Sequence, residues 1–150
     1  MPTAVGSSAA PPASYSLPRT NAKVLALLEP SLATARRILD IGAGEGYLAS
    51  RVHDLVVSRG HRVQVEACDL FPDNFRVPHV PCHAINLQGG LPLPDQSFDL
   101  AYSVEVLERR IFARVAIAMT QQLPHLRFQG FKPRFANYFI ETILMQRAIS

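Results

Sequence analysis

The sequence is poor in the features that mark several large classes of protein. It has no tryptophan, only two cysteines and 18% charged residues among 150. Two cysteines are too few for the disulfide framework of a small secreted domain, and they indicate reduced core thiols instead. No apolar run approaches the roughly 20 residues that cross a bilayer, since the longest near-candidate is Val115–Met119. These shortages exclude a disulfide-stapled scaffold and a helical membrane protein, and no membrane partner is expected.

The first 16 residues also have little variety. Alanine, serine, proline and threonine dominate residues 1–16, which predicts a disordered tail. The tail has no basic start followed by an apolar core, which disfavours a secretory signal and favours a cytoplasmic location. No acid precedes Glu29, and Arg19 and Lys23 are the only basic residues there, so an organelle transit peptide stays open as an alternative.

What the sequence does have is a glycine turn between a strand and a helix. Ile38–Ile41 is a short apolar run of the kind found in buried parallel strands. Gly42, Gly44 and Gly46 follow, and helical periodicity begins after them. Glycines let the backbone bend and approach a ligand closely, while N–H groups at a helix start face that ligand. The pattern predicts a site for a nucleotide-like ligand, with a ligand-free tight turn as the alternative.

The spacing of the glycines separates two kinds of site. A dinucleotide fingerprint is G-x-G-x-x-G, whereas this turn is G-x-G-x-G and has Tyr47 in the place of the last glycine. With Asp40, the run Leu-Asp-Ile-Gly-Ala-Gly-Glu-Gly resembles motif I of the class I S-adenosylmethionine-dependent methyltransferases. The resemblance implies a Rossmann-like, three-layer α/β fold with S-adenosylmethionine as cofactor. It disfavours a nicotinamide-dependent oxidoreductase.

Three further segments resemble the family in the same order. The first, Arg62–Asp69, alternates like a strand and ends on an acid. In the family, the acid at this position accepts hydrogen bonds from the ribose hydroxyls, a task that suits an acceptor-only carboxylate. Asp69 is preferred to Glu66, which lies inside the strand, and Leu70 would lie beside the adenine. A capping role for Asp69 before the Phe71–Asp73 turn is the alternative.

The other two segments are Cys82–Leu87, which resembles a short third strand, and Pro92–Glu108. Asn86 stands where the family usually has aspartate, and its side-chain oxygen can still accept from the adenine amino group. A simple turn role for Asn86 stays open. Phe98–Val104 is expected as a fourth strand beside the first, at the switch point where open α/β sheets bind ligands. The resemblance therefore predicts a cofactor rim made of Asp40, Gly42, Ala43, Gly44, Gly46, Asp69, Leu70, Asn86, Leu87 and Ser103.

Two helices are expected to support the sheet. Arg19–Glu29 has an apolar face and is predicted to end before Pro30. The helix after the glycine turn is predicted to end at Gly60. Its apolar positions have the i, i+4, i+7, i+8 spacing of a core-facing stripe: Leu48, Val52, Leu55 and Val56.

The resemblance weakens after Glu108. Family members continue with a histidine and later a Lys-Pro-Gly-Gly turn, whereas this chain has Arg109 and no such turn. Residues 109–150 hold seven lysines and arginines against one acid, and spacings of four predict two helical pieces, at Ile111–Met119 and Phe135–Ile143. The sequence therefore resembles a methyltransferase type 11-like domain at residues 17–108, truncated after motif IV and followed by a basic helical tail at residues 109–150.

The function that follows is methyl transfer to an acceptor that the sequence does not identify, a small molecule or a macromolecule. No residue is a convincing catalytic base. Glu105 and Glu108 resemble part of a metal site in related enzymes, but Arg109 opposes a cation, and no metal is assigned to them or to the histidines. The cations of the tail are dispersed, which disfavours nucleic acid. The alternative is a truncated or degenerate, non-catalytic member that binds the cofactor weakly or acts through a partner chain. The exposed edge of the fourth strand would then pair with another copy or with that partner.

Overall fold

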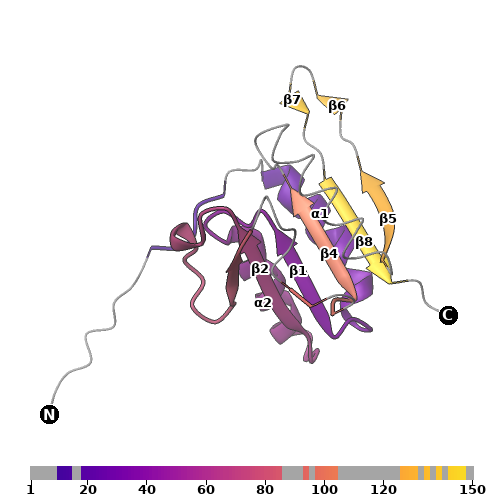
Figure 1. Ribbon diagram of the computed structural model, residues 1–150. Helices are drawn as coiled ribbons and strands as arrows, with labels where there is room; N and C mark the ends of the chain where they lie inside the picture. The colour runs from indigo at the N-terminus through magenta and orange to yellow at the C-terminus, as the bar shows by residue number, and fades with distance from the viewer. Residues whose placement is uncertain are drawn as a thin grey trace, which may run out of the picture.

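The computed structural model describes residues 10–14, 18–85, 93–94 and 97–104, together with the backbone of residues 126–131, 134–135, 138–139 and 142–147. The described chain forms an α/β fold in which one six-stranded sheet has the strand order β3-β2-β1-β4-β8-β5 (Figure 1). A second, two-stranded sheet pairs β6 with β7. In chain order the elements are α1 (Pro18–Leu32), β1 (Arg37–Ile41), α2 (Tyr47–Ser58), β2 (Gln64–Asp69), the 3-10 helix η1 (Pro72–Asn74), β3 (Cys82–Ala84), β4 (Leu100–Val104), β5 (Leu126–Phe131), β6 (Arg134–Phe135), β7 (Tyr138–Phe139) and β8 (Thr142–Arg147).

The first four strands are parallel, as predicted. β1 pairs with β2 on one side and β4 on the other, and β3 pairs with the outer edge of β2. Ile38–Ile41 and Leu100–Val104 are buried on both faces, which is why these runs are almost continuously apolar. The chain builds outward from β1 to β3 and then returns to place β4 on the opposite side of β1. The predicted switch point between β1 and β4 is confirmed.

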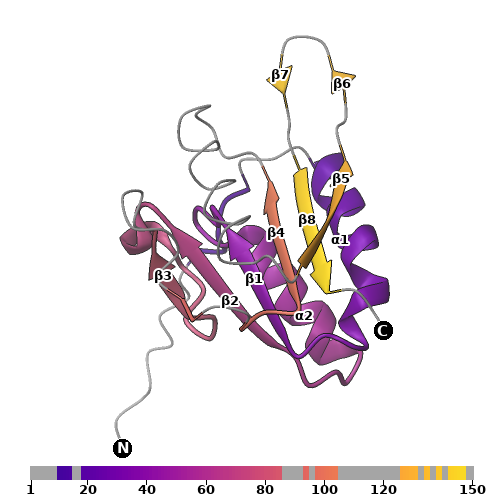
Figure 2. The same ribbon diagram turned by 45° about the vertical axis from the view of Figure 1, so that its right-hand side comes forward.

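The two helices cover the same face of this parallel half (Figure 2). α2 buries Leu48, Val52 and Val56 in the core, as their spacing predicts. Gly60 follows α2 with φ 68°, and its N–H donates to the Val57 carbonyl at 3.0 Å. The predicted stop at Gly60 is therefore confirmed, because a left-handed residue there satisfies the last carbonyls of the helix.

The predicted end of α1 is wrong. The helix includes Pro30 and continues to Leu32, although a proline inside a helix removes one hydrogen bond and costs about 3 kcal/mol. Leu32 is 1% exposed, and burying a leucine side chain contributes about 1.5–3 kcal/mol. The Ser31 carbonyl also accepts the N–H of Ala35 at 2.9 Å. Core packing and this hydrogen bond offset the cost of the proline in the last turn.

The second helical piece predicted for the tail is also wrong. The described backbone between residues 126 and 147 forms strands, with β8 antiparallel to β4 and β5 antiparallel to β8. A spacing of four among aromatic residues fitted a helix, but an open strand edge at β4 offers a row of backbone partners that a helix cannot use. The edge of β4 expected to receive a partner chain is thus occupied by β8, and the outer strands of the sheet are β3 and β5.

Strands β6 and β7 project beyond the main sheet (Figures 1 and 2). Thr142 is level with both Val104 and Phe131, so β4 and β5 end at the edge where β8 begins. The projection therefore extends from the carboxyl edge of β4, the edge at which the sequence predicts the cofactor rim. The piece predicted as helical at residues 111–119 lies outside the described residues.

Candidate functional site

The glycine turn leaves β1 as a tight loop held against β2. Gly42, Gly44 and Gly46 all have positive φ, at 76°, 57° and 95°, which explains the choice of glycine at each. The N–H groups of Gly42 and Ala43 donate to the Cys68 carbonyl at 2.8 and 3.2 Å. Gly46 is then the N-cap residue of α2 and has no side chain to cap it. The turn thus brings the start of α2 to the carboxyl edge of the sheet.

Asp69 ends β2 and fastens the glycine turn. Its Oδ2 accepts the N–H of Gly44 at 2.8 Å, and its Oδ1 accepts the N–H of Phe71 at 2.9 Å. The second bond is the turn-capping contact considered as an alternative, so the two roles coexist. A carboxylate offers about four lone-pair positions, and two backbone donors leave room for two more. Asp69 can therefore hold the turn and still accept from a ligand.

Asp40 lies deeper than a direct ligand contact requires. It is 3% exposed, and its Oδ2 accepts the hydroxyl of Tyr102 at 3.0 Å. Burial raises the pKa of Asp40 to about 7. The hydrogen bond from Tyr102 opposes this rise, and so does a hydrogen bond with the backbone of Ala49, whereas the nearby Asp69 carboxylate adds to the rise. Ala49 is the third residue of α2. Asp40 therefore joins β1, β4 and the start of α2, and Tyr102 is a site residue that the sequence did not single out.

A loop after β2 packs over the glycine turn. A Cβ added to Gly46 would lie 2.6 Å from side-chain carbons of both Phe75 and Val77. The Arg76 N–H donates to the Glu45 carbonyl at 3.0 Å, and the Arg76 Nε lies 3.4 Å from the Glu45 carboxylate. The same carboxylate accepts the N–H of Ala13 at 3.0 Å. Two segments distant in sequence thus meet at Glu45, inside the turn.

Of the other residues predicted for the cofactor rim, the structure describes Leu70 and Ser103. Leu70 is half-buried directly after Asp69. Ser103 is fully buried near the end of β4, level with Ile41, and its Oγ has no hydrogen-bond partner within the described structure. Asn86 and Leu87 lie outside the described residues, so their assignment to the adenine stays a prediction.

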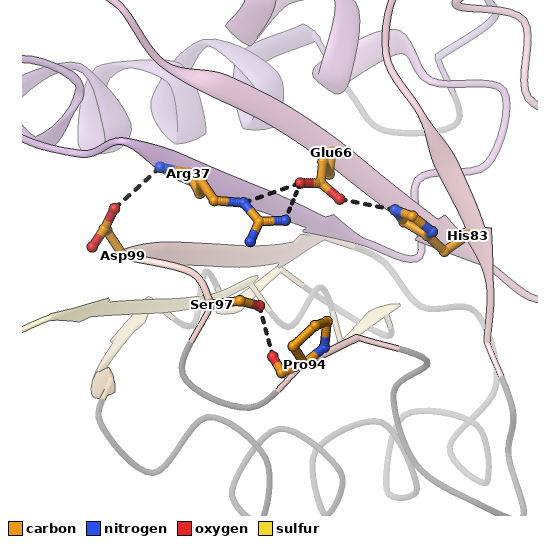
Figure 3. Close-up of polar contacts among 6 residues, drawn as sticks. All are labelled: Arg37, Glu66, His83, Pro94, Ser97 and Asp99. Carbon is orange, nitrogen blue, oxygen red and sulfur yellow. Dashed lines mark hydrogen bonds and ion pairs between the residues drawn. The ribbon is translucent and has the colours of Figure 1, made fainter.

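A polar cluster lies on the face of the sheet opposite to the side chains of Asp40 and Asp69 (Figure 3). Glu66, 3% exposed, accepts from Arg37 through Oε1 and lies 2.8 Å from His83 Nε2 through Oε2. Burial alone would raise the pKa of Glu66. The hydrogen bonds and charges of Arg37 and His83 lower that pKa by more, so the net shift is downward. The Arg37 guanidinium also lies 4.6 Å from the centre of the Phe98 ring. Both carboxylate oxygens of Glu66 are therefore engaged by side chains of the sheet, and the assignment of the ribose acid to Asp69 stays a prediction.

We expect Glu66→Gln to lower the free energy of unfolding by about 2 kcal/mol at pH 7, less than the 3–5 kcal/mol for a fully buried pair, because both partners reach solvent. A carboxylate with a lowered pKa stabilises the fold above its unfolded pKa and loses that contribution as pH falls. The difference between variant and wild type should therefore shrink below about pH 4 in urea titrations. Glu29→Gln is the control, since the ion pair of Glu29 with Arg59 is exposed. Its loss should lower the free energy of unfolding by under about 0.5 kcal/mol. Equal effects from the two variants would contradict the buried role.

The cysteines and histidines form no metal site in the part of the chain that the structure describes. Cys68 is buried and Cys82 half-buried, and both are free thiols whose pKa burial raises, for Cys82 to about 11. The rings of His53 and His79 lie 4.2 Å apart. No group of three metal-ligating side chains occurs among the described residues. No helix there is long and apolar enough to cross a bilayer.

Comparisons relate the chain to known methyltransferases. A sequence profile of the protein-L-isoaspartate(D-aspartate) O-methyltransferase family matches residues 2–73, just under half of the chain. The comparison with curated proteins finds no match. Among solved structures, an SAH-bound methyltransferase of Podospora anserina is 10% identical, with a TM-score of 0.50 over 89% of this chain and 80% of that one. The chain has the fold of the class I methyltransferases.

Two other solved structures are similar to this class I methyltransferase fold. An O-methyltransferase from Bacillus cereus in complex with SAH is 13% identical, with a TM-score of 0.48 over 91% of this chain and 84% of that one. A structure described as cmcI-N160 SAH is 21% identical, with a TM-score of 0.42 over 51% of this chain and 41% of that one. The chain thus spans less than half the length of the latter. At these identities the likeness concerns the fold alone.

Proposed function

We propose that the chain binds S-adenosylmethionine and serves in the transfer of its methyl group to an acceptor. The observation that carries this proposal is the hydrogen bond between Gly44 in the glycine turn and Asp69 at the end of β2. It joins the two elements that the resemblance assigns to the methionine and ribose ends of the cofactor. That solved structures of the same fold are described as complexes with SAH, S-adenosylhomocysteine, supports the choice of ligand.

The residues present fit such a ligand. Asp69 keeps free lone pairs after accepting two backbone N–H groups. The Ser103 hydroxyl is a buried polar group without a partner in the described structure, and such groups need one. Gly42–Gly46 would hold the methionine end, Asp69 the ribose and Leu70 the adenine, with Asn86 and Leu87 as further adenine contacts.

The bound cofactor would supply an activated methyl group on a sulfonium, open to direct displacement by a nucleophile. The contribution of the chain is then alignment and exclusion of water. The Phe75–Val77 loop packs against the glycine turn, and it would shield one side of a ligand bound there from water. We assign no residue the role of base, and the described residues identify no acceptor.

Two alternative functions belong to other classes of protein, a non-catalytic binding protein and an oxidoreductase. A truncated or degenerate member would keep the fold, would bind the cofactor weakly or act through a partner chain, and would transfer no methyl group. A nicotinamide-dependent oxidoreductase is disfavoured, because Tyr47, in the place of the last glycine of the dinucleotide fingerprint, is the first residue of α2. The free thiols are compatible with the cytoplasmic location that we propose.

Calorimetric titration of the purified chain with S-adenosylhomocysteine, in the presence and absence of NAD, tests the proposal. We expect micromolar binding that NAD does not compete with. Activity is then measured against a panel of acceptors that begins with an isoaspartyl peptide, the substrate named by the matching family. Binding without turnover would favour the degenerate alternative. A folded sample that binds NAD and not S-adenosylhomocysteine would overturn the proposal.

Asp69→Ala is expected to weaken the binding of S-adenosylhomocysteine by about 1–3 kcal/mol, the usual cost of removing hydrogen bonds to a charged group. That loss corresponds to a roughly 5- to 150-fold rise in Kd. Asp73→Ala is the matched control, since this exposed aspartate lies in η1 of the same loop. It should leave Kd unchanged. An unchanged Kd in Asp69→Ala would mean that the ribose acid is misassigned.

A further inference from the structure

Asp40 and Asp69 place two carboxyl groups on one face of the sheet, beside the start of α2. Asp40 is level with Ala67, and alternate residues of a strand share a face, so Asp69 lies on the same side. The partners of Asp40 are the Tyr102 hydroxyl and the backbone of Ala49. None of the ion pairs in the described part of the chain includes it. A buried carboxyl group without a cation, and near a second carboxylate, is costly to ionise.

We propose that Asp40 loses its proton when a positively charged ligand binds over the glycine turn, so that the site favours a sulfonium over the neutral thioether. The inference rests on the proposed function. S-adenosylmethionine and S-adenosylhomocysteine carry the same ammonium and carboxylate groups, so the sulfonium of the first against the thioether of the second is the charge that differs between them. A cation near a buried carboxyl group lowers the cost of its negative charge, and little solvent is present to screen the attraction. The proton passes to the buffer, and no covalent bond of the ligand changes.

The hydroxyl and thiol groups around Asp40 do not change protonation near neutral pH. Burial raises the pKa of the Tyr102 hydroxyl well above its usual value, so it keeps its proton and donates. Burial likewise raises the pKa of the Cys68 and Cys82 thiols, which remain neutral. The Asp69 carboxylate is the charged neighbour that opposes the ionisation of Asp40. Asp40 is therefore the group, among these neighbours, that can exchange a proton with the solvent on binding.

The test is calorimetric titration of the whole chain at pH 7 in buffers of different ionisation enthalpy, with S-adenosylmethionine and S-adenosylhomocysteine as separate ligands. The dependence of the measured enthalpy on the buffer gives the protons released. We expect up to about half a proton for the sulfonium, from a group half-ionised at pH 7, and clearly less for the thioether. Equal release with both ligands, or none with either, would overturn the inference. Failure of both ligands to bind would instead count against the proposed function.

Two variants locate the proton. Asp40→Asn keeps an oxygen for the Tyr102 hydroxyl and cannot ionise, so it should abolish the release. In the wild type we expect the preference for the sulfonium to grow roughly fivefold from pH 6 to pH 8, as Asp40 gains charge, and in the variant to stay level. Tyr102→Phe removes a donor that favours the carboxylate and should move the release to higher pH. Release that survives Asp40→Asn, or that moves to lower pH in Tyr102→Phe, would contradict the assignment to Asp40.

Discussion

A methyl group added at Gly46 is expected to lower the free energy of unfolding by about 3 kcal/mol. The residue has φ 95°, and a left-handed backbone costs a non-glycine residue about 1–2 kcal/mol. The new Cβ of Gly46→Ala would also lie 2.6 Å from carbons of Phe75 and Val77, and overpacking of this kind costs about 1–3 kcal/mol. Urea unfolding monitored by circular dichroism measures the change. Cofactor binding should weaken as well, since the loop over the turn must move.

Gly60→Ala is the matched control for this variant. Gly60 also has positive φ, 68°, but a Cβ there meets nothing within 4 Å. Only the backbone cost remains, about 1–2 kcal/mol, and cofactor affinity should not change because Gly60 lies at the far end of α2. If the two variants lose the same stability, the packing of Phe75 and Val77 on the turn does not matter. If Gly46→Ala keeps full affinity, the turn is not part of the ligand site.

The parallel half of the fold was readable from the sequence because local signals and packing agree there. Ile38–Ile41 is apolar because both faces of β1 are covered, and the three positive-φ glycines need that residue type whatever packs nearby. The choice of Asp69 over Glu66 depended on position in the strand alone. In the structure Glu66 is held by Arg37 and His83 on the opposite face of the sheet from Asp69, and the role of Asp69 toward the ribose stays a prediction.

The errors have a common physical cause, namely partners distant in sequence. β8 is a strand because β4 and β5 supply backbone partners on both sides, and no local pattern at residues 142–147 contains that information. Pro30 stays helical because the core holds Leu32. The Tyr102–Asp40 pair joins positions 62 residues apart. The one signal that could have suggested this pair is that two strands expected to be neighbours each carry a polar side chain within an apolar run, an aspartate in one and a tyrosine in the other.

The second large effect concerns pH. Burial raises the pKa of Asp40 from its ordinary value of 3.8 to about 7 in the folded protein. Between these values the folded chain holds a proton that the unfolded chain has lost, so this group makes stability fall as pH rises from about 4 to about 7. At 1.36 kcal/mol per pKa unit, the total is at most about 4 kcal/mol. Asp40→Asn should remove this fall, so that near pH 8 the variant is as stable as the wild type or more stable.

The comparison with the variant is needed because other groups titrate in the same range. Burial and the nearby His79 lower the pKa of His53, while Asp54 raises it; the net effect adds stability as pH rises, opposite in sign to that of Asp40. The wild-type profile alone can therefore look flat, whereas the difference between wild type and Asp40→Asn isolates one group. Asp54→Asn, at an exposed position on α2, is the control and should keep the contribution of Asp40. If urea titrations from pH 4 to pH 8 give parallel curves for wild type and Asp40→Asn, Asp40 is ionised throughout. The buried carboxyl group would then need a cation that the described residues do not supply.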